Sequence, residues 1–117
     1  MKGILIDVKN RVVREVEINK DDILKSLYEL IGCDLVDRVG LTDTDDIWVD
    51  DEGLLTANDD TNFFSLVGHP SPFAGNGLVL GYNKMGDSVE PKITVESVRM
   101  KVKFYTMKEI QRMGHWE

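Results

Sequence analysis

The sequence predicts an α+β fold, a mostly antiparallel β-sheet with one or two helices packed on one face. Short alternating runs of apolar residues separated by turn residues predict strands, and one helix-length stretch repeats its apolar residues every three or four positions. The strands follow one another instead of alternating with helices, which favours hairpins over a parallel sheet. A chain of 117 residues is one ordinary domain. We therefore expect residues 1–117 to form a single α+β domain.

The first predicted elements are a hairpin and a helix. Residues 2–8 and 11–18 are strand-like, and the two polar residues between them suit a tight turn. Asn19 can cap the following helix, whose apolar stripe covers residues 23–31. Gly32 is typical of the residue that ends a helix.

The middle of the chain predicts short strands and one long irregular stretch. Residues 33–41 and 46–50 alternate as strands, and after a turn residues 54–55 begin another. Residues 57–76 are the least regular part of the chain, with a short helix expected around residues 63–67. Loops of this length inside compact domains are often binding elements.

The last third predicts two strands and a helix. Residues 77–83 form an apolar strand, and residues 93–105 read as one long strand with a bulge where the apolar phase shifts. Thr106 and Glu109 form a capping-box pattern, which predicts a final helix that runs to Met113.

The charge of the chain is concentrated in one segment. The net charge is −7, and residues 39–83 carry eight acids and no lysine or arginine. This excess disfavours direct binding to nucleic acid, because phosphate contacts supply most of that affinity. A small basic stripe of Arg99, Lys101 and Lys103 fits a solvated sheet face or a protected edge.

The sequence argues against metal, cofactor and catalytic chemistry. Residues 58–62 resemble a calcium loop, but counting from Asn58 puts Phe63 and His69 where an EF-hand needs glycine and glutamate. Cys33 is the only cysteine, so neither an intrachain disulfide nor a cysteine metal cluster can form. We expect no metal, no cofactor and no enzymatic activity.

The glycines near residue 77 do not form a phosphate-binding loop. Gly75, Gly77 and Gly81 precede a strand instead of opening a helix, where a dinucleotide phosphate would bind. We expect these glycines to serve turns that need positive φ.

The location expected from the sequence is the cytoplasm. No apolar run approaches the roughly 20 residues that span a bilayer, and the N-terminus lacks the apolar region of a signal peptide. A single free cysteine also fits a reducing compartment. No membrane partner is expected.

Several sequence blocks stand in an order that resembles a known family. These blocks are MKGILID, LYELIGCDLVDRV, DDIWVDDEGLL, FAGNGLVLGYNKMGD and YTMKEIQRM. They are similar to the DUF3846 proteins, small proteins of unknown function found in bacteriophages and in bacterial genomes with mobile elements. The resemblance implies a phage-type accessory protein. It implies no active site, because the family has none characterised.

The leading functional hypothesis is a binding protein that occupies a basic surface of a host factor. Trp48 shares a predicted strand face with aspartates, so an exposed tryptophan there would be an interface anchor with a charged rim. The expected partner-binding residues are Asp43, Asp45, Asp46, Trp48, Asp50, Asp51 and Glu52.

Two alternatives come from other classes of protein. The first is a protein that binds or sequesters a nucleotide-like small molecule, with His69, Phe73, Asn76 and Tyr82 stacking on it and hydrogen-bonding to it. The second is a structural or assembly subunit, in which the long strand 93–105 pairs across a homo-oligomer.

Overall fold

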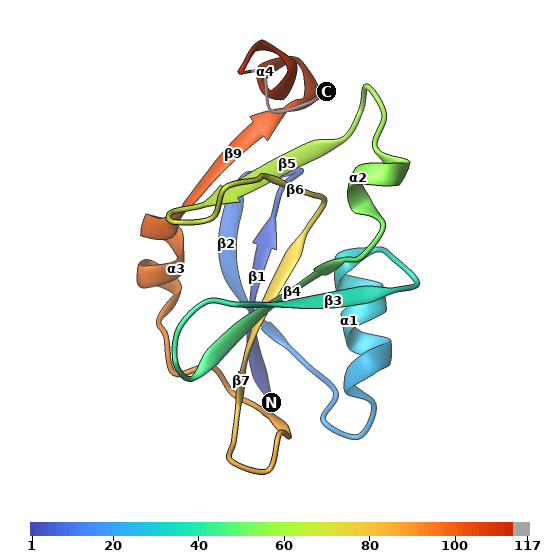
Figure 1. Cartoon of the computed structure of the whole chain (residues 1–117). Helices are drawn as coiled ribbons and strands as arrows, with labels where there is room; N and C mark the ends of the chain where they lie inside the picture. The colour runs from blue at the N-terminus through green and yellow to red at the C-terminus, as the bar shows by residue number, and fades with distance from the viewer. Residues whose placement is uncertain (114–117) are drawn as a thin grey trace.

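The computed structural model describes residues 1–113, which form two antiparallel sheets and four helices (Figure 1). The strands are β1 Lys2–Asp7, β2 Val12–Glu17, β3 Val36–Gly40, β4 Asp45–Asp50, β5 Asn62–Leu66, β6 Phe73–Ala74, β7 Gly77–Tyr82, β8 Ser88–Val89 and β9 Val102–Thr106. The helices are α1 Ile23–Ile31, α2 Gly53–Thr56, α3 Val95–Lys101 and α4 Met107–Arg112. The predicted α+β class, with a mostly antiparallel sheet, is confirmed.

The main sheet has the strand order β2-β1-β7-β4-β3, with β8 paired to the end of β7, and the small sheet has the order β6-β5-β9. Helix α1 packs on one face of the main sheet, where its Leu27 contacts the cluster that contains Leu5 and Leu78. The small sheet and α3 cover the other face, with Phe64 and Val98 in the second cluster. The helices therefore lie on both faces of the main sheet instead of one (Figure 1).

The beginning of the chain folds as the sequence predicts. Strands β1 and β2 form the expected hairpin, in which Lys2 lies opposite Glu17 and Asp7 opposite Val12. Helix α1 ends at Gly32, which adopts the left-handed conformation with φ 80°. Its N-cap is Asp22 instead of Asn19, because the Asp22 carboxylate accepts the backbone N–H of Lys25. Asn19 instead accepts the backbone N–H of Asp21 in the preceding turn.

Three predicted elements differ from the structure. Residues 93–105 are not one strand, since they contain the helix α3 followed by the strand β9. Residues 63–67 do not form a helix, because most of this stretch belongs to strand β5. Residues 54–55 lie in the short helix α2 instead of a strand. The basic stripe of Arg99, Lys101 and Lys103 is consequently divided between α3 and β9.

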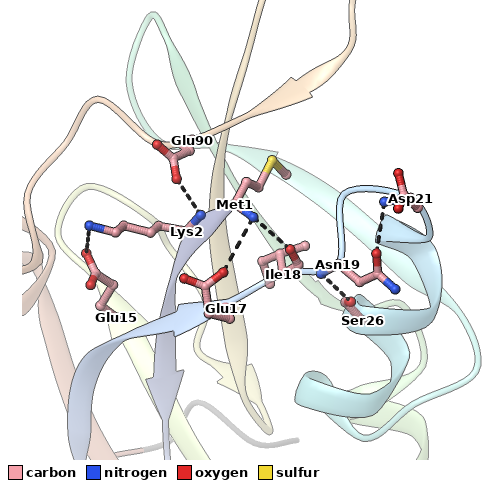
Figure 2. A network of polar contacts seen from close by, with 9 residues as sticks. All are labelled: Met1, Lys2, Glu15, Glu17, Ile18, Asn19, Asp21, Ser26 and Glu90. Carbon is pink, nitrogen blue, oxygen red and sulfur yellow. Dashed lines mark hydrogen bonds and ion pairs between the residues drawn. The ribbon is translucent and has the colours of Figure 1, made fainter.

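A polar network ties the start of β1 to two neighbouring segments (Figure 2). The amino group of Met1 donates to the Ile18 carbonyl at 2.9 Å and lies 3.5 Å from the Glu17 carboxylate. The backbone N–H of Lys2 donates to the Glu90 carboxylate, which follows β8. Met1 is partly buried but Glu17 is exposed, so their ion pair is worth roughly 0–1 kcal/mol. These polar contacts position the segment after β8 against the edge of the hairpin.

Candidate functional site

The acidic segment does not form one continuous surface. Asp43 precedes β4, whereas Asp51 and Glu52 follow it. The six residues of β4 separate these two groups by roughly 17 Å, at the usual rise of a strand. The negative charge that the sequence predicts as a single patch is therefore divided between the two ends of one strand.

Asp45 is buried and does not belong to any surface. Its side chain is 0% exposed, and its carboxylate accepts the backbone N–H of Lys92 at 3.0 Å and that of Ile93 at 2.7 Å. The prediction that Asp45 contacts a partner is corrected by this burial. The carboxylate instead fixes the chain segment that leads into α3.

Trp48 and Asp46 both interact with Arg38, an arginine of the neighbouring strand. Arg38 lies opposite Trp48 in the β3–β4 ladder. Its guanidinium is 5.6 Å from the Trp48 ring centroid, and its Nε is 3.4 Å from the Asp46 carboxylate. Trp48 is half-buried and packs against the leucine cluster beneath α1. The structure therefore places the Arg38 guanidinium over the Trp48 ring, where the sequence predicts a free tryptophan anchor with a charged rim.

Two of the predicted ligand-binding residues have structural roles. The Asn76 side chain accepts the backbone N–H of Val8 at 3.0 Å and donates to the Leu30 carbonyl at 3.0 Å. It thereby joins the end of β1 to α1. The Tyr82 hydroxyl donates to the Asp43 carbonyl at 2.7 Å. Asn76 and Tyr82 do not line the pocket that contains His69 and Phe73.

That pocket lies where the β3–β4 ladder, α2 and β6 meet, and its volume is about 240 Å³. Val39, Val49 and Leu54 supply aliphatic lining, and Phe73 supplies an aromatic wall. The Phe73 ring is held in place by two other rings, at 5.1 Å from the Phe64 centroid and 4.6 Å from that of His69. The His69 Nδ1 atom lies 3.1 Å from the Ser71 carbonyl oxygen, which orients the imidazole.

Three acidic residues line the pocket together with His69. Asp37, Asp50 and Asp51 are the acidic residues of this lining, and among residues 1–113 no lysine or arginine contributes to it. Asp50 accepts the backbone N–H of Glu52 at 2.9 Å, and Asp37 accepts that of Arg38 at 2.8 Å. Both carboxylates keep further acceptor positions, since a carboxylate offers about four. Acidic residues beside apolar side chains suit a cation whose attached stem is apolar.

Exposed leucines lie beside this acidic pocket. Leu55 of α2 is 84% exposed and Leu54 is 47% exposed, and both line it. Leu35, 50% exposed, directly precedes β3, and its carbonyl accepts the Asp51 N–H at 3.0 Å. Apolar side chains exposed together near a pocket are typical of an interaction surface.

The pocket combines residues from both sequence hypotheses with residues that neither included. Asp50 and Asp51 belong to the predicted partner site, and His69 and Phe73 belong to the predicted ligand site. Sequence reasoning missed Asp37, Val39 and Leu54. For Leu54 the local signal is its place in the pair Leu54-Leu55 after the acidic turn 51–53, a signal that does not extend to Asp37 and Val39.

Cys33 is not activated as a nucleophile. Burial raises the pKa of its thiol above the ordinary value, and the nearby carboxylates of Asp50 and Asp34 raise this pKa further. Within residues 1–113, no group of three or more histidine, cysteine or acidic side chains is arranged to hold a metal ion. Over the same residues, no helix has the length and apolar character needed to cross a bilayer.

The fold and pocket define a small α+β protein with a pocket lined by acidic and apolar residues. Residues 1–103 match the family model described as a domain of unknown function, DUF3846, and the chain belongs to this family. The chain is also 26% identical over 99 residues to an uncharacterized protein, y4iR, of Sinorhizobium fredii. That alignment covers 85% of this chain and 60% of the relative's length. No solved structure matches the chain.

Proposed function

We propose that this protein is a non-enzymatic binding protein that takes a lysine or arginine side chain of a partner protein into the acidic pocket. The observation that carries the proposal is the composition of the lining. Three acidic residues, Asp37, Asp50 and Asp51, line the pocket beside aliphatic and aromatic side chains and His69, and among residues 1–113 no lysine or arginine lines it. A long basic side chain matches both parts, because its stem is apolar and its end is charged.

The acidic rim and the leucines make complementary contributions to this proposal. Opposite charges steer the partner and set the orientation of binding. The exposed Leu54 and Leu55 supply apolar area that a partner can bury around the charged contact. The net charge of −7 extends the attraction beyond the pocket, so association should slow as salt is added.

The size and charge of the pocket disfavour a nucleotide as its ligand. Pockets for small molecules usually enclose roughly 300–1,000 Å³, whereas this one encloses about 240 Å³. Its carboxylates would also repel a phosphate group. The assembly-subunit alternative loses its basis, because residues 93–105 do not form the long strand that it requires.

The biological setting is a further part of the proposal. We propose that the protein is a phage-type accessory factor and that its basic partner is a host factor in the cytoplasm. The support for this setting is the resemblance of the sequence blocks to small proteins encoded by phages and mobile elements.

The proposal is tested by titrating the ¹⁵N-labelled protein with acetyl-lysine methylamide and with acetyl-norleucine methylamide. The two probes have similar stems and differ in the terminal ammonium. We expect millimolar binding of the lysine probe, with amide shifts at Val39, Asp51 and Phe73. The norleucine probe should bind roughly tenfold more weakly, since exposed carboxylate contacts contribute about 0.2–1 kcal/mol each.

The control is a pair of variants with equal changes of charge. Asp37, Asp50 and Asp51 are replaced by asparagine in one, which preserves the backbone hydrogen bonds that Asp37 and Asp50 accept. In the other, Asp59→Asn, Asp60→Asn and Glu29→Gln neutralise exposed acids outside the pocket. The first variant should lose the preference for lysine and the second should keep it. Equal binding of both probes by the wild-type protein would refute the proposal.

A further inference from the structure

The outer edge of β3 carries backbone groups that no other strand within the described residues pairs. β3 ends the main sheet, and within residues 1–113 its ladder partner is β4 alone. The Asp51 N–H donates to the Leu35 carbonyl at one end of β3, and the Leu41 N–H donates to the Asp45 carbonyl at the other. Backbone direction alternates along an antiparallel ladder. The N–H and C=O groups of Val36, Arg38 and Gly40 therefore point away from β4.

The acidic pocket opens beside this same edge. Asp37 and Val39 belong to β3 and line the pocket, so their side chains lie on its face of the sheet. A strand added along β3 would direct every second side chain to that face. A basic residue in such a strand would approach Asp37, whose side chain lies on that face, and would supply the positive charge that the pocket lacks.

Asp37 connects the edge to the pocket. Its carboxylate accepts the Arg38 N–H at 2.8 Å, which satisfies the central outward donor of the edge. Charged side chains that cover outward backbone groups protect an edge strand from indiscriminate pairing. A cation in the pocket would attract this carboxylate, and the Arg38 N–H would then be free to pair with an incoming strand.

We infer that the partner presents its basic residue on an extended segment, which adds to the β3 edge as an extra strand. This inference rests on the proposed function, since it concerns the same pocket. Main-chain hydrogen bonds supply affinity in this mode of recognition, and the pocket supplies specificity. Asp37 restricts the pairing to segments that bring a positive charge.

The test compares a pentapeptide, acetyl-Thr-Val-Lys-Val-Thr-amide, with acetyl-lysine methylamide. Gly40→Pro removes one outward N–H, whereas Gly40→Ala retains it and has room, since the nearest atom to a Cβ there is 4.0 Å away. Wild-type protein and Gly40→Ala should bind the pentapeptide at least tenfold more tightly than the single residue. Gly40→Pro should lose roughly this tenfold gain, given the usual worth of a hydrogen bond and the clash of the ring. Its binding of acetyl-lysine methylamide should be unchanged.

A second measurement does not depend on the proline variant folding. One peptide is N-methylated at the lysine and another at the two valines, which blocks opposite edges of the added strand. Strand pairing predicts that one pattern abolishes binding and the other preserves it. Equal affinities of the two methylated peptides would overturn the inference.

The outcomes separate this inference from the proposed function. If acetyl-lysine methylamide fails to bind, the proposed function itself fails. If it binds at the pocket while Gly40→Pro and Gly40→Ala bind the pentapeptide equally, only the strand pairing is overturned. Concentration-dependent shifts of the Arg38 and Gly40 amides without peptide would assign the edge to a second copy of the chain, which also overturns the inference.

Discussion

The carboxylate of Asp45 accepts the backbone N–H of Ile93 at 2.7 Å, across 48 positions of the chain. The same carboxylate accepts the Lys92 N–H through both oxygens, at 3.0 and 3.1 Å. Asp45 begins β4 and Ile93 lies just before α3. This one buried acid therefore fixes the segment that brings α3 against the main sheet.

Replacing Asp45 by alanine should destabilise the protein by about 3 kcal/mol. Hydrogen bonds to a charged group are worth about 1.5–3 kcal/mol, and buried donors left without a partner add a penalty. Urea unfolding followed by circular dichroism measures the change. Asp43→Ala is the matched control, because Asp43 is exposed and contributes its backbone carbonyl to the bond with Tyr82. Indistinguishable midpoints for the two variants would contradict this role of Asp45.

Cys33 should react slowly with alkylating reagents. Burial raises the pKa of its thiol, and Asp50 and Asp34 raise the pKa further, which lowers the fraction of reactive thiolate at neutral pH. We expect alkylation by iodoacetamide at pH 7.5 to be several-fold slower than that of glutathione, and to reach the ordinary rate in denaturant. Asp50→Asn should move the midpoint of the pH–rate profile downward. A pH–rate midpoint for Cys33 in the native protein at or below that of glutathione would contradict the raised pKa of the Cys33 thiol.

Asp7 should make the free energy of unfolding depend on pH. Burial alone would raise the pKa of Asp7, but hydrogen bonds from the Asn10 side chain and backbone, together with Arg14, lower it below the usual value. The unfolded chain then binds the proton more readily, so the stabilisation is complete above about pH 4 and is lost as pH falls through the lower folded pKa. The difference in unfolding free energy between wild type and Asp7→Asn should shrink from pH 5 to pH 2. Asp59→Asn is the control, because Asp59 is exposed. If the difference in unfolding free energy between wild type and Asp59→Asn shrinks equally from pH 5 to pH 2, the pH dependence is not specific to Asp7.

The sequence predicts the parts of the fold that local chemistry determines. The β1–β2 hairpin, the left-handed Gly32 at the end of α1 and the Thr106–Glu109 capping box each depend on residues within a few positions. Helix α3 was missed because β-branched residues at 93, 95, 98 and 102 favour a strand. Its local signals were the Thr94 side chain, which caps the N–H of Ser97, and the basic residues of its last turn.

The remaining errors come from tertiary packing. Phe63 and Phe64 are adjacent in β5 and both are fully buried, because the small sheet packs on the main sheet with one face and on α4 with the other. Such a strand shows no alternation of apolar and polar residues, so periodicity cannot distinguish it from a helix. The pocket could not be predicted from the sequence, because it too depends on tertiary contacts. It brings Asp37 together with Asp51 and Phe73, and only the ladder and the β6 pairing place these residues side by side.

Gly77 of β7 lies against Phe64 of the small sheet. Its φ is not positive, unlike that of Gly75 at 85°, so the expected role in a turn is wrong for Gly77. A Cβ atom at this position would meet the Phe64 Cζ at 2.8 Å and the Ile47 Cγ2 at 3.2 Å. Phe64 of the small sheet can therefore pack against β7 because Gly77 has no side chain.

Gly77→Ala should destabilise the protein by about 1–3 kcal/mol, the usual cost of an extra methyl group in a packed core. Gly40→Ala is the control, since the nearest atom there is 4.0 Å away and little change is expected. Shortening the opposing ring by Phe64→Leu should recover part of the loss, because the two positions are in contact and their effects should not add. Urea midpoints of the wild type, the two single variants and the double variant Gly77→Ala/Phe64→Leu complete this cycle. If the effects of Gly77→Ala and Phe64→Leu are strictly additive, the contact between the two residues does not explain the glycine.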